Sequence, residues 1–158
     1  MVTREYSIEV DRPREKLFSV LSKISNWPEI FPACEAINII DEKDNKVVFE
    51  IHAVNKTGKM SWKTESVIQP NDFTITSKQL ESGNNKLKMM HTYWKLESIG
   101  ENKTLVKFTR KFNSKVKTPI VKGLVERRLI LRKIMEPVIR EDLNALTNID
   151  EKLYLSSN

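Results

Sequence analysis

The chain has 158 residues, of which 39% are hydrophobic and 30% charged, and its formal net charge is +6. These values predict a single domain over residues 1–158 and exclude a disordered or membrane-spanning chain, since no stretch reaches the roughly 18 apolar residues of a spanning helix. The N-terminus lacks the apolar segment of a secretory signal, so we expect a cytoplasmic protein. Cys34, expected in a loop, is the only cysteine. With His52 and His91 as the only histidines, we expect neither a disulfide nor a metal site.

The positive charge is spread along the chain. The 27 Lys and Arg residues are spread among 21 Asp and Glu residues. The densest basic group, around Arg127 and Arg128, has the spacing of a solvated helix face. Proteins that bind nucleic acid gather their basic residues into a patch. We therefore expect no nucleic-acid partner, while a transient membrane or protein contact of this basic segment stays open.

The N-terminal part of the chain predicts one strand and two short helices. Residues 2–10 alternate with the period of 2 that is typical of a strand. Asp11-Arg12-Pro13 supplies a cap and an early proline, and apolar residues follow at helical spacing. Asn26 and Glu29 have the spacing of a capping box, which predicts a second short helix that Pro32 limits.

From Ile37 to Phe112 the pattern predicts six strands joined by turns. Short runs rich in Gly, Asn and Asp separate them, such as Lys56-Thr57-Gly58 and Gly100-Glu101-Asn102. These connections are too short for parallel crossovers, so we expect an antiparallel sheet. With the first strand, the predicted sheet has seven strands.

A long C-terminal helix is predicted to begin at Thr118-Pro119, with a kink near residues 133–136 because Pro137 removes a hydrogen bond. The apolar face of the sheet needs a cover, and this helix is the only predicted element long enough to supply it. We therefore predict an α+β fold in which a curved, seven-stranded antiparallel sheet wraps around the C-terminal helix.

Alternation predicts a mixed set of side chains on the inner face of the sheet. Hydroxyl groups and Arg110 lie among aromatic rings and methionines, which a filled core does not ordinarily tolerate. An apolar pocket with a few polar groups is typical of a small-molecule site. The candidate ligand-binding residues are Phe49, Ile51, Trp62, Thr64, Ser66, Met90, Thr92, Trp94, Phe108 and Arg110 on the sheet, and Leu124 and Leu131 on the helix. Alternatively, the rings only pack the core and Arg110 extends its head into water.

Several motifs resemble a known family. Residues 5–31, with Asn26-Trp27-Pro28-Glu29-Ile30-Phe31-Pro32 at their end, are similar to the opening of the polyketide cyclase/aromatase and coenzyme Q-binding lipid-transfer branch of the START-like superfamily. Trp62-Lys63-Thr64-Glu65-Ser66, Met90-x-Thr92-x-Trp94 and the segment 106–112 follow in the expected order. The resemblance implies a helix-grip fold with a deep cavity for a lipid, quinone or polyketide. The residues that it implies for the cavity lining are Trp27, Phe31, Trp62, Thr64 and Trp94.

Two positions depart from the cyclase pattern. Ser66 stands where cyclases commonly carry arginine, and Arg110 stands where many members carry histidine. Arginine is a poor base, and the predicted inner faces place no histidine or carboxylate beside the hydroxyls. Alternation directs both histidines outward. No phosphate-binding glycine loop is present, so we expect no cofactor.

We therefore expect the chain to bind or transfer a hydrophobic small molecule, with Arg110 holding its polar head. Two alternatives stay open. One is a polyketide cyclase or dehydratase that acts mainly by positioning, with Arg110 polarising a carbonyl. The other is a protein-interaction module that uses the basic C-terminal helix. The sequence predicts no particular ligand or oligomeric state.

Overall fold

The computed structural model describes residues 2–55, 58–81, 87–114 and 136–156. The predicted strands and short helices are confirmed, whereas Thr118, Leu124, Arg127 and Leu131 of the predicted long helix lie outside the described residues. The elements are β1 (Val2–Val10), α1 (Arg14–Leu21), the 3₁₀ turn η1 (Ile24–Asn26), α2 (Trp27–Ile30), β2 (Cys34–Lys43), β3 (Lys46–Asn55), β4 (Gly58–Gln69), β5 (Thr74–Glu81), β6 (Leu87–Gly100), β7 (Lys103–Ser114), α4 (Glu136–Ala145), the 3₁₀ turn η3 (Leu146–Asn148) and α5 (Glu151–Ser156).

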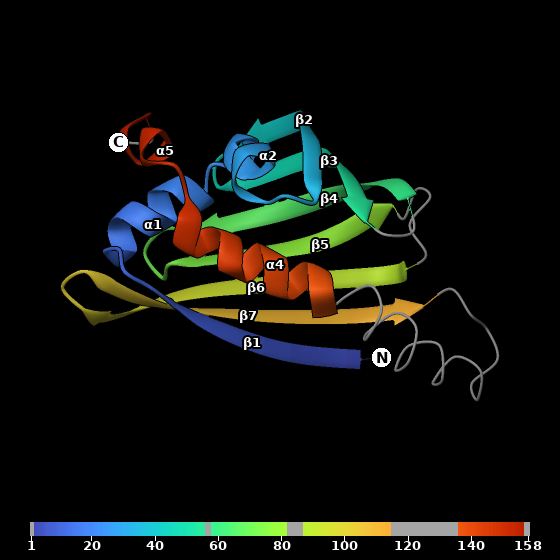
Figure 1. Cartoon of the computed structure of the whole chain (residues 1–158). Coiled ribbons are helices and arrows are strands. Elements are labelled where there is room, and N and C mark those ends of the chain that lie inside the picture. Colours follow the sequence, from blue (N-terminus) through green and yellow to red (C-terminus); the bar gives the residue numbers. More distant parts are fainter. Residues whose placement is uncertain (1, 56–57, 82–86, 115–135, 157–158) are drawn as a thin grey trace.

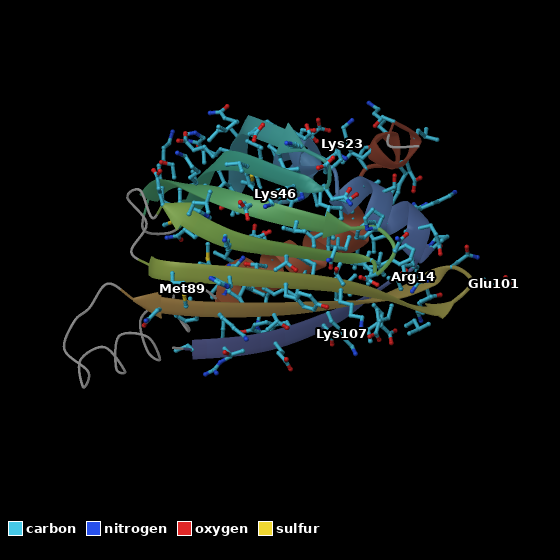
Figure 2. All side chains as sticks on the ribbon, turned by 180° about the vertical axis from the view of Figure 1, so that it is seen from behind. Arg14, Lys23, Lys46, Met89, Glu101 and Lys107 are labelled. Carbon is cyan, nitrogen blue, oxygen red and sulfur yellow. The ribbon has the colours of Figure 1, made fainter. Side chains whose placement is uncertain are left out.

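The seven strands form one antiparallel sheet in the order β1-β7-β6-β5-β4-β3-β2. The first strand therefore pairs with the last, and β1 and β2 are the two edges. Register shifts interrupt the β2–β3, β4–β5 and β6–β7 pairs, and such bulges bend and twist a sheet locally. The sheet curves around α1, α2 and α4, which all lie on its inner side (Figure 1). Seen from behind, these helices lie beyond the sheet (Figure 2). The predicted α+β architecture is thus confirmed.

Alternation sorts the side chains between the two faces, as the sequence predicts. On β7, Phe108 and Phe112 are buried while Lys107 and Lys111 are exposed. On β1, the half-buried even-numbered residues face the same side, and Tyr6 pairs in register with Phe108. Because side chains of paired residues project to the same face, β1 extends the inner face by one strand.

The predicted helix caps are wrong, and other contacts replace them. Pro13 occupies the N-cap position of α1, and Asn26 has helical backbone angles, so neither position makes a side-chain cap hydrogen bond. The Asn26 Nδ2 instead donates to the Val20 carbonyl at 3.0 Å, and the Trp27 Nε1 donates to the Leu21 carbonyl at 2.9 Å. These bonds satisfy carbonyls at the end of α1 that have no partner within the helix. They also fix α2 against α1.

Phe73, in the turn between β4 and β5, holds α1 against the sheet. Its ring contacts Phe18 edge-on, with centroids 5.4 Å apart, and the Arg14 guanidinium lies 3.9 Å above its centroid. Its backbone has φ 53°, which is unfavourable for an aromatic residue. The ring contacts and a hydrogen bond from the Leu96 amide to the Phe73 carbonyl, 3.0 Å long, compensate for this strain.

Candidate functional site

Five of the predicted site residues form one continuous run of ring contacts, which we call the aromatic run. Ring centroids lie 5.6 Å apart for Phe49 and Trp27, 5.8 Å for Trp27 and Phe31, 6.0 Å for Phe31 and Trp94, and 4.4 Å for Trp94 and Phe108. All five side chains are buried. The rings of Trp27 and Phe31 are therefore packed directly on β3 and β6, and Trp94 continues the run to Phe108 on β7. Part of the predicted lining thus has the ring-on-ring contacts that the core-packing alternative expects.

A row of polar side chains crosses the inner face beside the aromatic run. Ser66 of β4 pairs with Ser77 of β5, Ser77 pairs with Thr92 of β6, and Thr92 pairs with Arg110 of β7. The two serines and the threonine are buried, and the serine Oγ atoms are 2.6 Å apart. The Ser66 hydroxyl is therefore engaged within the sheet. Ser77 was not predicted as a site residue, although its alternation with the apolar Ile75 places it on the inner face.

Arg110 ends this row as a half-buried side chain. Its guanidinium lies 5.0 Å from the Phe108 ring centroid, and its Nε is buried with no hydrogen-bond partner among the described residues. Burial lowers the pKa of Arg110, while Asp142 and Tyr6 act in the opposite direction. An arginine nevertheless stays protonated at neutral pH. Because the side chain as a whole is only half-buried, the alternative that Arg110 extends the end of its head into water stays open.

Asp142 on α4 supplies a carboxyl group that the sequence reading missed. Burial raises the pKa of Asp142 to about 7, an effect that Arg110 opposes and Glu141 reinforces. The Asp142 Oδ1 is buried and, within the described parts of the chain, accepts no hydrogen bond. Its spacing from Ile139 and Leu146, which are both buried, was the available signal, because residues three and four apart share one helix face.

Tyr6 on β1 is the third polar group here and was also not predicted. Its hydroxyl is buried and, in the described ranges, has no hydrogen-bond partner. Burial raises its pKa, as does Glu136, whereas Arg4, Arg140 and Arg110 lower it. Because α4 contacts β1, the hydroxyl lies where the sheet and the C-terminal helix meet. Arg110 thus interacts electrostatically with two polar groups, Tyr6 and Asp142.

Cys34 lies on the inner side of the sheet as well. It is the first residue of β2 rather than a loop residue, and it is buried. Burial raises the pKa of its thiol to about 12, and Asp142 adds to the effect. A thiol with such a pKa is almost fully protonated at neutral pH, so it is a poor nucleophile.

The remaining predicted site residues differ in how deeply they are buried. Thr64 and Met90 are buried on the inner face, whereas Ile51 and Trp62 are only half-buried and pack at the edge of the core. Ile51 and Trp62 pair in register on β3 and β4, so the inner face is more open toward this side of the sheet. Leu124 and Leu131 lie outside the described residues.

Both histidines face away from this region, as alternation predicts. His91 is exposed, and the His52 Nε2 lies 2.6 Å from Glu50 Oε1 and 3.3 Å from Asn38 Nδ2. Elsewhere on the outer face, the Lys107 Nζ lies 3.2 Å from Glu97 Oε1. Lys107 is labelled in the view of this face (Figure 2). The described residues include no group of three or more His, Cys, Asp or Glu side chains that could hold a metal ion. They also include no helix long and apolar enough to cross a membrane.

A seven-stranded antiparallel sheet that curves around a C-terminal helix, with two short helices after the first strand, defines the helix-grip fold of START-like proteins. The chain belongs to the polyketide cyclase/dehydrase and lipid transport family, whose model matches residues 10–147.

Solved structures share this fold. The Zhui aromatase/cyclase from Streptomyces sp. R1128 is 22% identical, with 93% of this chain and 92% of that chain covered and a TM-score of 0.83. The protein TTHA0849 from Thermus thermophilus is 16% identical, with 99% of both chains covered and a TM-score of 0.78. A START superfamily protein from Mycobacterium smegmatis is 15% identical, with 96% and 98% covered and a TM-score of 0.72. At these identities the similarity concerns the fold.

Proposed function

We propose that the chain binds a hydrophobic small molecule between the inner face of the sheet and the C-terminal helix. The apolar part of the ligand would lie along the aromatic run, and its polar end would lie at Arg110 and Asp142. A lipid, an isoprenoid quinone and an aromatic polyketide all combine these two parts. Membership in a family described by both polyketide cyclisation and lipid transport supports this range of ligands.

The observation that carries the proposal is the set of unused polar atoms on the inner side. Arg110 Nε and Asp142 Oδ1 are both buried and have no hydrogen-bond partner among the described residues. Leaving a buried charged group without its hydrogen bonds costs about 1–3 kcal/mol or more. Such a cost is commonly retained at sites where a ligand satisfies the groups.

A pair of substitutions on neighbouring residues tests the proposal. Trp94 is buried on the inner face, whereas Tyr93 is exposed on the outer face. Trp94→Arg should abolish the saturable binding of a fluorescent long-chain lipid probe, because it introduces a charge into the apolar region. Tyr93→Arg should leave binding unchanged, and circular dichroism would confirm that both variants are folded. Equal binding by two folded variants would contradict the proposal.

Asp142 favours a second candidate function, a polyketide cyclase or dehydratase. General acid–base catalysis is most effective when the pKa of the group lies near the working pH, and the pKa of Asp142 is raised to about 7. Beside it, Arg110 could polarise a carbonyl oxygen. The structural similarity to the Zhui aromatase/cyclase is consistent with this chemistry.

A turnover assay distinguishes a cyclase from a carrier. For a cyclase, product formation from a poly-β-keto substrate should fall by at least about a hundredfold in Asp142→Asn and in Arg110→Ala, which is the usual contribution of a general acid–base group. For a carrier, the wild-type protein should bind the substrate without accelerating its conversion. The carrier is the simpler function because it requires only the contacts described above.

A further inference from the structure

We propose that Tyr6, Arg110 and Asp142 form a head-group subsite that takes an uncharged, oxygen-bearing group, such as an alcohol, in preference to a carboxylate. The inference rests on the proposed function and specifies the chemistry of the ligand's polar end. Its basis is that Tyr6 on β1, Arg110 on β7 and Asp142 on α4 each have a buried polar atom without a partner among the described residues. Strand β1 pairs with β7, α4 contacts β1, and Arg110 interacts electrostatically with both other groups, so the three side chains lie near one another.

The hydrogen-bonding capacity of the three groups is complementary to a hydroxyl group. Arg110 Nε can only donate, an ionised Asp142 can only accept, and the Tyr6 hydroxyl can do both. A ligand alcohol can accept from Arg110 and donate to Asp142 at once. A carboxylate has no proton to donate, so its oxygens would face the Asp142 oxygen without a hydrogen bond.

The charge of the subsite also favours an uncharged head group over a carboxylate. When Asp142 is ionised, it balances Arg110, so a carboxylate would add an uncompensated negative charge in a buried position. The other charged groups near the subsite are Arg4 on β1 and Glu136, Arg140 and Glu141 on α4. Arg140 and Glu141 are exposed, so solvent screens them more than it screens the half-buried Arg110 and Asp142, whereas Arg4 and Glu136 are half-buried like Arg110.

The test compares two probes that differ only at the head, a dansyl-labelled long-chain fatty acid and the dansyl-labelled alcohol of the same chain length. Titrations at pH 8 keep Asp142 largely ionised, since its pKa is about 7. The wild-type protein should bind the alcohol about tenfold more tightly than the acid, which corresponds to a difference in binding free energy of about 1.4 kcal/mol. Asp142→Asn should improve binding of the acid by about tenfold, because Arg110 then has no competing carboxylate.

Two further variants make the test specific. Glu101→Gln makes the same change from acid to amide in the exposed turn between β6 and β7, and it should keep the wild-type preference. Tyr6→Phe removes one hydroxyl with little change in volume and should weaken alcohol binding about threefold to tenfold. Tyr6→Phe should weaken binding of the acid less than binding of the alcohol. This variant provides a second measurement if Asp142→Asn is poorly folded.

The outcomes distinguish this inference from the proposed function. If the wild-type protein binds both probes equally, or if Asp142→Asn and Tyr6→Phe leave the ratio of the two dissociation constants unchanged, the inference is wrong while hydrophobic binding stands. If the protein binds neither probe, both the inference and the proposed function are wrong.

Discussion

Asp142 on α4 and Arg110 on β7 lie close enough to shift each other's pKa, yet the described residues satisfy neither Asp142 Oδ1 nor Arg110 Nε with a hydrogen bond. A buried pair of opposite charges is normally held by direct charge-assisted hydrogen bonds, which offset part of the cost of removing both charges from water. Here the two groups instead present unused hydrogen-bonding capacity beside a buried aromatic surface. This relationship connects the fold to ligand binding.

Asp142 makes stability depend on pH in a direction opposite to that of most carboxyl groups. Its pKa in the fold is about 7, above its ordinary value of 3.8, so the folded state retains a proton that the unfolded chain releases. The free energy of unfolding should therefore fall as pH rises between about 4 and 7, by up to about 1.4 kcal/mol per pH unit. Asp142→Asn should lack this component.

Urea denaturation of both proteins at pH 5 and pH 8 measures the difference. Relative to the wild type, Asp142→Asn should be more stable at pH 8 than at pH 5, whereas Glu101→Gln should show no such change. A constant difference at the two values of pH would mean that Asp142 titrates normally in the fold.

Cys34 should be almost unreactive in the folded protein. Its burial and the raised pKa of about 12 leave little thiolate for alkylation at pH 8. Mass spectrometry should detect negligible modification by iodoacetamide in buffer and one adduct in urea, because the chain has a single cysteine. Comparable labelling rates under both conditions would contradict the buried position.

At Phe73 a glycine substitution should be less destabilising than an alanine substitution, which is the reverse of the usual ranking. Both substitutions remove the contacts with Phe18 and Arg14, but only glycine accepts φ 53° without strain. Phe73→Gly should therefore be about 0.5–1 kcal/mol more stable than Phe73→Ala in urea denaturation.

The same pair of substitutions at Thr76, which is exposed on β5, is the control for Phe73. There the glycine variant should be the less stable one, because glycine weakens a strand interior. Identical rankings at the two positions would count against a strained backbone at Phe73.

Trp94 and Tyr93 should differ sharply in their contributions to stability. Trp94 contacts the rings of Phe31 and Phe108, so Trp94→Ala should cost about 3–5 kcal/mol. Tyr93 is 38% exposed, and Tyr93→Ala should cost about 1 kcal/mol or less. Thermal denaturation of the two variants compares them, and similar losses would show that the two faces of β6 are not distinguished as described.

Periodicity was sufficient to predict the architecture, because strands of period 2 joined by short turns restrict the sheet to antiparallel pairing. It also placed Trp94, Phe108 and Arg110 on the correct face. It could not predict that Ser66 and Ser77 share a hydrogen bond, since that contact depends on the register between β4 and β5.

The polar groups beside Arg110 were missed for a different reason. The C-terminal helix is predicted from its apolar positions, which do not indicate that an acidic residue such as Asp142 lies within the apolar stripe. Tyr6 was treated as an ordinary strand residue. Only the pairing of β1 with β7 and the position of α4 bring these residues to Arg110, and both are long-range contacts.

A crystal structure of the chain with a bound long-chain alcohol tests the central claim most directly. We expect the alkyl chain against Trp94 and Phe31, and the ligand oxygen within hydrogen-bonding distance of Arg110 and Asp142. A ligand bound only on the outer face of the sheet, or an inner side filled completely by the protein's own side chains, would contradict it.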